Sequence, residues 1–337
     1  MPEINVNGWL PIRIPLRMPD FFPPDFSECL EQFCHGLVSV LPVLYPPIIS
    51  VKSRIITPPS YVIKDLCTLN GGGWFEPKLY KFLHVQCVME YDNDQMNFPE
   101  ESNVDGMLMG FAACGLASTL EDALLLAQLS FPTRIHSASG RTYLGRYPMN
   151  KVSRVSGIPS ECIWNPAMKW PKVRTIPLET VCEWEIKLGL FQQGIARTPV
   201  QRALASFSHL VTTKSIHGGE SLFWSMQGLE SFYCRGNGDL QRQLSEKSRL
   251  FLGQWIGLKN NIVGSLYGFR SRFVHGDFNL ERWNNNLEPE KEDMKGQEAL
   301  HSAVLLATRM LLSTLQRCAD ECITSVEIEY SLKIDHG

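Results

Sequence analysis

The distribution of proline divides this chain into two parts that can fold in different ways. Of 21 prolines, 20 lie at or before Pro199, and only Pro289 follows. Proline has no backbone N–H and breaks the interior of a helix, so the part after Pro199 is free to form long helices. The front part is expected to consist of shorter, interrupted elements.

Alternating apolar residues in the front part are typical of strands. Residues Leu83–Tyr91 alternate along a single face, and a proline-interrupted alternation runs through Ile12, Ile14 and Leu16. A capping-box pattern of Ser118 and Glu121 predicts the start of a helix that continues to Leu129. We therefore predict an α+β domain over residues 1–175.

Helical periodicity dominates the rear part, where Thr198 and Pro199 form an N-cap followed by proline at the first helical position. The segment Glu179–Phe191 alternates like a strand, yet no turn separates it from the helices beyond, which favours a helix. The tail Val326–Ile334 alternates as a terminal strand would. Five apolar stripes at helical spacing predict a helical bundle over residues 176–337: Val200, Ala203, Phe207, Val211; Leu222, Met226, Leu229, Tyr233; Leu240, Leu244, Phe251; Ile262, Leu266, Phe269, Phe273; and Leu300, Val304, Ala307, Leu311, Leu315, Cys318.

Composition and charge narrow the class of protein. Hydrophobic residues make up 44% and charged residues 20%, as in a folded soluble protein, and the net charge of −3 argues against a globally basic nucleic-acid coat protein. No uninterrupted apolar run approaches a membrane span, so we expect no membrane partner and a cytoplasmic location. Ten cysteines without a CxxC pair predict reduced thiols and no metal site.

The fourth stripe carries the residues with the most chemistry. At 100° per residue, its apolar side lies almost opposite Ser271, so Tyr267, Ser271 and His275 are expected outside it, with Arg270 on the flank. Gly276 is expected to end the helix, which places the His275 imidazole where the helix dipole favours its protonated form.

An arginine and a histidine suit RNA cleavage without a metal. The imidazole can take a proton from a ribose 2′-hydroxyl or deliver one to the leaving oxygen, and the guanidinium can stabilise charge that builds on phosphate. No tight carboxylate cluster is present to hold Mg²⁺, so no cofactor is expected. Arginine and histidine at this spacing also arise by chance, and a helix-end histidine that caps carbonyls beside a surface arginine is the alternative.

The sequence around these residues resembles a known family. Residues Leu266–Gly276 resemble the signature helix of the ApeA-like branch of the HEPN superfamily, Gly228–Phe232 looks like its second helix, and Leu240–Leu252 is similar to its third. The resemblance extends from Arg197 to Cys322, under half of the chain. Nothing before residue 175 takes part in it.

The resemblance implies a homodimeric, metal-independent endoribonuclease used in host defence or as a toxin. Two copies of the Arg-x4-His helix would form one composite site, with Arg270 and His275 as catalytic residues and Ser271 and Tyr267 in support. Arg270 and His275 are about 140° apart and ~7.5 Å along one helix, so a single copy aims them poorly at one phosphate. The rival interpretation is a non-catalytic HEPN bundle for dimerisation or for binding RNA or protein.

Further expectations concern Glu230, the basic residues near the site and the front domain. Glu230 either orients a catalytic group or caps or pairs with Arg249 inside the bundle. Arg272, Arg249 and Lys259 are candidate RNA-binding residues, although a solvated helix face would show the same charges. Residues 1–175 carry no catalytic constellation, so we expect this domain to sense a regulatory ligand or protein and to gate the nuclease.

Overall fold

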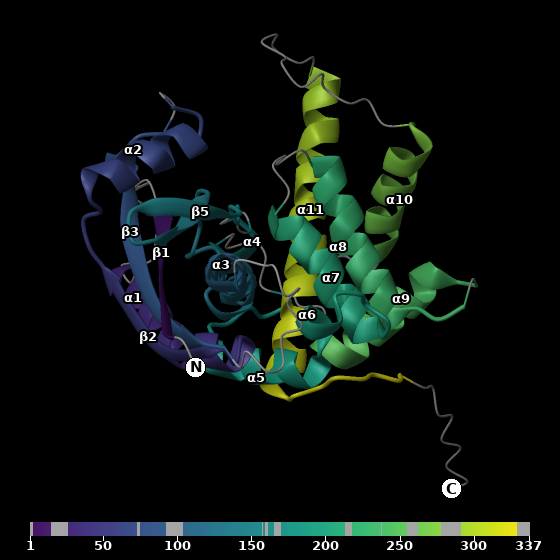
Figure 1. The fold of residues 1–337 in the computed structure, drawn as a ribbon. Helices are drawn as coiled ribbons and strands as arrows, with labels where there is room; N and C mark the ends of the chain where they lie inside the picture. The colour runs from purple at the N-terminus through teal and green to yellow at the C-terminus, as the bar shows by residue number, and fades with distance from the viewer. Residues whose placement is uncertain are drawn as a thin grey trace, which may run out of the picture. The chain divides into compact units, whose positions relative to one another are not determined.

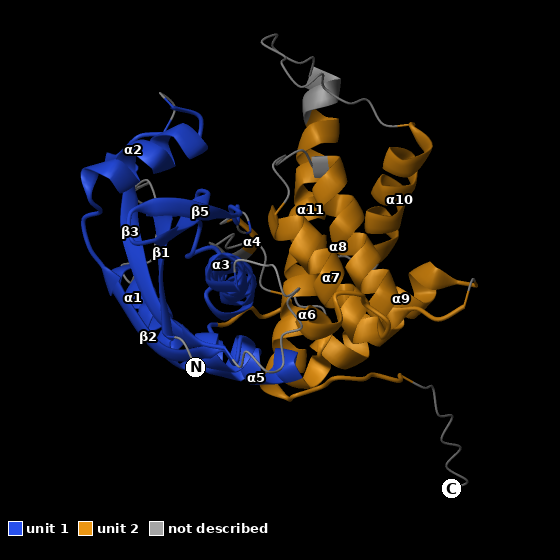
Figure 2. Ribbon diagram, in the orientation of Figure 1, with its two compact units in different colours: residues 1–158, 175–186 blue, residues 159–174, 187–337 orange. Residues whose placement is uncertain are grey.

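The computed structural model describes residues 3–14, 26–72, 75–91, 104–156, 158, 161–164, 170–212, 218–236, 238–254, 262–277 and 291–328. The chain forms two compact units, shown in Figure 2. Unit 1 consists of residues 1–158 and 175–186, and unit 2 of residues 159–174 and 187–337. The sequence suggested one boundary near residue 175, whereas each unit here includes a short segment from beyond that boundary.

A five-stranded antiparallel sheet forms the centre of unit 1, in the order β2-β3-β1-β4-β5 (Figure 1). The strands are β1 Glu3–Arg13, β2 Ile48–Ile55, β3 Tyr80–Glu90, β4 Gly140–Leu144 and β5 Tyr147–Val152. The predicted strand at Leu83–Tyr91 is confirmed as β3, whose alternate residues from Leu83 to Met89 are fully buried. Ile12 lies in β1 opposite Lys81, and Leu16 lies outside the described residues.

Helices pack on this sheet: α1 Phe26–Leu44, α2 Ser60–Leu69 and α3 Val104–Ser130, with the short 3-10 turn η2 Pro77–Leu79. The prediction that a helix begins at Ser118 is wrong, because α3 begins fourteen residues earlier. Glu121, the supposed capping partner, instead accepts a hydrogen bond from the Ser153 backbone N–H at 2.5 Å. The segment from Val104 to Ser118 consists mostly of small and apolar residues and contains no proline, so the helix continues through it.

α3 is also longer and more apolar than the sequence analysis allowed. By length and composition it could cross a membrane, although 56% of its most apolar window is buried within the structure. It packs on β1, β4 and β5, and a core helix passes the same test of length and composition. The expectation concerned uninterrupted apolar runs, and Glu121 and Asp122 interrupt this helix, which meets a test that tolerates two charged residues.

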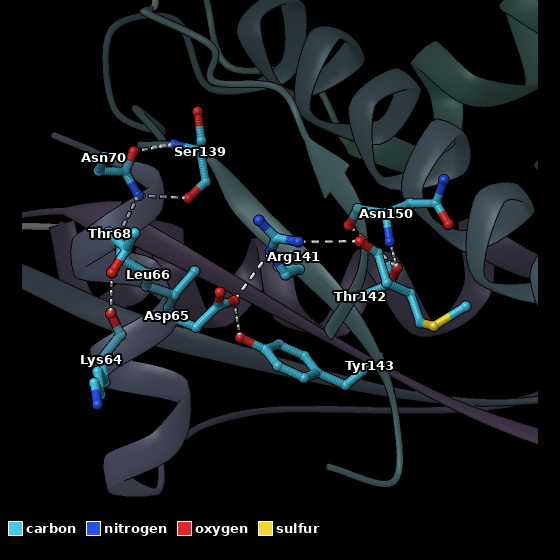
Figure 3. Close-up of polar contacts among 11 residues, drawn as sticks. Lys64, Asp65, Leu66, Thr68, Asn70, Ser139, Arg141, Thr142, Tyr143 and Asn150 are labelled. Atoms are coloured by element: carbon cyan, nitrogen blue, oxygen red, sulfur yellow. Dashed lines mark hydrogen bonds and ion pairs between the residues drawn. The ribbon is translucent and has the colours of Figure 1, made fainter. Parts of the chain in front are cut away.

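A polar network attaches α2 to the sheet (Figure 3). Asp65 on α2 lies 3.0 Å from Arg141 Nε on β4 and accepts a 2.7 Å hydrogen bond from the Tyr143 hydroxyl. Asn70 bonds both the N–H and the C=O of Ser139 at 2.9 Å. Burial, with Asp65 beside it, raises the pKa of Tyr143 well above its usual range, so its hydroxyl stays a donor. These contacts give the network a structural role.

Unit 2 is a bundle of helices, which confirms the predicted order of an α+β region followed by an all-α region. The five predicted helices are present, and every residue of the stripe predicted for the longest one is buried. α5 carries the chain from unit 1 into unit 2, so the ambiguous segment is helical. Apart from α5 Leu178–Leu188, most of which belongs to unit 1, the helices are α4 Glu161–Trp164, α6 Leu190–Gln193, α7 Pro199–Thr212, α8 Gly218–Tyr233, α9 Leu240–Leu252, α10 Ile262–His275 and α11 Lys291–Asp320.

Of the two local predictions at the ends of the bundle, the helix cap at Thr198 is confirmed and the terminal strand is not. Thr198 caps α7 as predicted: its hydroxyl accepts from the Gln201 N–H at 3.2 Å, and Gln201 Oε1 accepts from the Thr198 N–H at 3.0 Å. The predicted terminal strand is not formed over 325–328, and its remainder lies outside the described residues. Alternation alone does not make a strand without a partner strand.

Candidate functional site

Arg270 faces the interior of unit 2. α10 packs against α8 and α9, and its residues Val263 and Leu266 are buried on that side. Arg270 lies on the same side, with its Nη2 3.5 Å from Oε2 of Glu230 near the end of α8. The two side chains are 29% and 14% exposed, so the pair is largely shielded from water. The structure thus places Glu230 in an ion pair with Arg270.

Tyr267 belongs to this interior cluster, which corrects the expectation that it lies on the outer side of α10. It is half-buried, and its hydroxyl lies 3.9 Å from Sγ of Cys234, the residue after the end of α8. Tyr267 and Arg270 are three residues apart and so share one face of the helix. The predicted buried face lies too far around the helix from them because it includes Phe269, whereas Val263 is fully buried and Phe269 is not.

The electrostatics of this cluster centre on the Glu230 carboxylate. Burial raises the pKa of Glu230, and the nearby Arg270 and the Tyr267 hydroxyl offset part of that rise. Oε1 of Glu230 is buried and has no hydrogen-bond partner among the described residues. Burial also raises the pKa of Tyr267 well above its usual range, so its hydroxyl remains protonated. Arg270 is therefore held in place by a carboxylate, one oxygen of which has no hydrogen-bond partner among the described residues.

His275 is exposed at the C-terminal end of α10, as predicted. The helix ends there because Gly276 takes a left-handed φ of 79°. The Gly276 N–H donates to the Phe273 carbonyl at 3.4 Å and the Asp277 N–H to the Arg272 carbonyl at 2.8 Å. This pair of bonds is the Schellman motif, which fixes the backbone that carries the imidazole.

The final turn of α10 is also seated tightly on α8. A Cβ atom added at Gly219 would lie 1.9 Å from Cε2 of Phe273. Only a glycine lets the Phe273 ring approach the α8 backbone this closely. Gly219 and Phe273 therefore determine how the end of α10, and with it His275, is positioned on the bundle.

The outer side of α10 is exposed and partly apolar. Ser271 and His275 are exposed as predicted, and Val274 keeps 47% of its surface accessible. Within one chain, Arg270 points toward α8 while His275 lies about 140° around the same helix. The structure of a single chain therefore does not bring the two candidate catalytic groups together.

The candidate RNA-binding residues are spread over two helices. Arg272 is exposed on α10, where its guanidinium lies 4.8 Å from the centre of the Phe269 ring. Arg249 is exposed on α9, and Lys259 lies outside the described residues. The two that the structure describes, Arg249 and Arg272, therefore lie on different helices.

One residue of the cluster was missed by the sequence analysis. Cys234 follows Glu230 by four residues, and its Sγ contacts both the Tyr267 hydroxyl and, at 3.4 Å, the Leu240 carbonyl. Burial raises the pKa of its thiol. The four-residue spacing from Glu230 is a signal that could have identified it, because residues at that spacing share a helix face.

Comparison of the chain with models of protein families, with curated proteins and with solved structures finds no match. The HEPN resemblance therefore rests on the residues of α8, α9 and α10 named above.

Proposed function

We propose that unit 2 is a metal-independent endoribonuclease of the HEPN type that acts as a homodimer. The observation that carries the proposal is the arrangement of α10. This helix holds Arg270 in place through Glu230 and presents His275 on a capped, exposed helix end. A histidine and a fixed arginine are the groups that cleavage through the ribose 2′-hydroxyl requires.

In the proposed reaction, the ribose 2′-oxygen attacks the adjacent phosphorus while the bond from phosphorus to the 5′-oxygen breaks. One proton leaves the 2′-hydroxyl and one joins the 5′-oxygen, so the products are a 2′,3′-cyclic phosphate and a 5′-hydroxyl. His275 carries out proton transfer, since an imidazole can both accept and donate a proton. Arg270 stabilises the charge on the phosphate oxygens with the N–H groups that do not face Glu230.

The distance around α10 between Arg270 and His275 supports a composite site. A second copy of α10, related by a twofold axis, would supply the group that one copy directs elsewhere. The exposed Val274 and Ser271 give this helix the mixture of apolar and polar surface that a partner covers. We propose that the dimer forms through this side of α10.

One observation favours the alternative of a non-catalytic HEPN module. Arg270 is engaged with Glu230 inside the bundle, where an arginine can serve stability alone. Incubating the protein with total RNA and EDTA, then mapping the new RNA ends, separates the two functions. The nuclease should leave 2′,3′-cyclic phosphate ends, and it should not cut at a 2′-deoxy position.

Two variants make the assay specific. His275→Ala should abolish cleavage, whereas the matched control His301→Ala, an exposed histidine on α11, should retain it. Intact RNA with the wild-type protein under every condition tested, or equal cleavage by both variants, would leave the binding module as the better explanation.

For unit 1 we propose a regulatory role, in which a ligand or protein partner controls the nuclease. The proposal follows from the sequence of residues 1–175, which offers no catalytic constellation of its own. Cleavage measured with and without cell extract, using purified protein at a fixed concentration, tests whether an activator exists. The family resemblance suggests a use in host defence or as a toxin.

A further inference from the structure

A pocket of about 350 Å³ lies in unit 2, and neither α10 nor Glu230 lines it. Its walls are the end of α9, the C-terminal half of α11 and the segment 171–174. The volume falls in the lower part of the range for small-molecule sites. The pocket therefore has the size for one compact ligand.

Side chains of α11 hold the segment that forms one wall. Arg309 donates to the Pro171 carbonyl at 2.6 Å, and Ser313 donates to the Lys172 carbonyl at 3.1 Å. Gln316 bonds both the N–H and the C=O of Arg174, at 3.1 and 2.5 Å. The backbone from Pro171 to Arg174 is thus held at three of its four residues.

This fixed backbone presents two cations to the pocket. Lys172 and Arg174 are alternate residues on a segment without helical structure, both are exposed, and both line the pocket. Arg317 on α11 adds a third cation. The fixed backbone sets the points from which these side chains reach, which lowers the entropy lost in the backbone when an anion binds.

The acidic neighbours do not balance these charges. Arg174 pairs with Asp320 at 2.7 Å, and Arg317 pairs with Glu321 at 2.8 Å. Lys172 makes no ion pair within the described part of the chain, which leaves one positive charge in excess. That excess favours an anionic ligand over a cationic or neutral one.

The remaining wall is apolar. Leu250 is 65% exposed at the pocket, and Phe251 lies under Arg317, whose guanidinium carbon is 4.5 Å from the ring centre. Trp170 Nε1 donates to the Gly253 carbonyl at 3.1 Å, which ties the end of α9 to the segment 170–174. An anion with an apolar or aromatic portion would use both sides of the pocket.

We propose that this pocket binds a phosphate ester with a compact organic group, such as a nucleoside monophosphate. Lys172 contacts the phosphate and the Leu250–Phe251 wall contacts the organic group. The phosphate could belong to a free nucleotide or to the end of an RNA strand. Binding at this site does not depend on the nuclease activity proposed above.

Titration calorimetry on the full chain tests the proposal with four probes: adenosine monophosphate, inorganic phosphate, and a 2′-O-methyl oligonucleotide with either a 5′-phosphate or a 5′-hydroxyl. Adenosine monophosphate should bind more tightly than inorganic phosphate if a free nucleotide is the source. Preference for the 5′-phosphorylated oligonucleotide over the 5′-hydroxyl form would instead assign the RNA end. Both outcomes support a phosphate-ester site.

The matched variants are Lys172→Glu and Lys295→Glu. Both lysines are exposed in unit 2, and Lys295 lies on α11 about 27 Å along the helix from Ser313. Lys172→Glu should weaken binding at least about tenfold, as expected for loss of one charge-assisted contact, and Lys295→Glu should not. Equal loss in both variants, no binding of any probe, or no preference for a phosphate ester over both inorganic phosphate and the 5′-hydroxyl oligonucleotide would overturn the proposal.

Discussion

Replacing Arg270 by alanine should destabilise unit 2, whereas replacing His275 should not. In the wild-type structure the Glu230 side chain is 14% exposed. The variant Arg270→Ala removes the counter-ion of this largely buried carboxylate. Removing one partner of a fully buried ion pair costs about 3–5 kcal/mol, and exposed pairs contribute about 0–1 kcal/mol. With Arg270 29% exposed and 3.5 Å from Glu230, we expect an intermediate cost of about 1–2 kcal/mol.

The comparison with His275 gives this prediction its control. Because His275 is exposed, His275→Ala should change the unfolding free energy by less than about 0.5 kcal/mol. Adding Glu230→Gln to Arg270→Ala removes the uncompensated charge and should recover most of the lost stability. Calorimetric unfolding of the four proteins measures these differences. Equal stability of Arg270→Ala and His275→Ala, or no recovery in the double variant, would refute the account of the ion pair.

The same cluster predicts how the loss should depend on pH. Burial raises the pKa of Glu230 in the folded protein, and Arg270 partly offsets that rise. Below the unfolded pKa of a glutamate, about 4.3, both states are protonated and the carboxyl has no effect on this balance. Between the unfolded and the folded pKa, the unfolded state has lost its proton while the folded state still holds it. The free energy of unfolding therefore falls as pH rises to the folded pKa. The stability difference between wild type and Arg270→Ala should therefore be larger at pH 8 than at pH 5.

Three other predictions concern α10 and rest on the proposed dimeric nuclease with Arg270 and His275 as its catalytic groups. Val274→Glu should both dissociate the dimer and end cleavage, and sedimentation with a parallel RNA assay checks whether the two effects are coupled. Mixing Arg270→Ala subunits with His275→Ala subunits should restore part of the activity if one intact arginine and one intact histidine suffice; a cleaving monomer would contradict the composite site. Gly219→Ala should displace Phe273 and lower cleavage without touching either catalytic group, while Gly296→Ala, at a position with open space around it, should leave cleavage unchanged.

The elements that the sequence predicted well are those with strong periodicity and a local end signal. α7 illustrates this, since its apolar stripe and its Thr198 cap are both confirmed. The start of α3 was misplaced because the Ser118–Glu121 pattern also occurs inside a helix. Local capping patterns identify a helix start only when the preceding residues cannot continue the helix.

The candidate site was only partly predictable for a different reason. The exposure of Ser271 and His275 followed from the helical period, and Gly276 gave the helix end. The inward direction of Tyr267 and Arg270 did not follow, because a polar residue turns inward only where a partner is present. Glu230 is that partner, and it lies forty residues away along the chain, beyond the reach of local patterns.

The interleaving of the two units restricts how this protein could have been assembled or rearranged during evolution. The chain passes between the units three times, after residues 158, 174 and 186. A gene fusion at a single junction near residue 175 would transfer unit 2 without Lys172 and Arg174, whose backbone is bound by α11. Recombination that exchanged the front unit intact would need three coordinated junctions, after residues 158, 174 and 186. We therefore expect relatives of this chain to keep the two units together more often than proteins do whose two domains meet at a single junction.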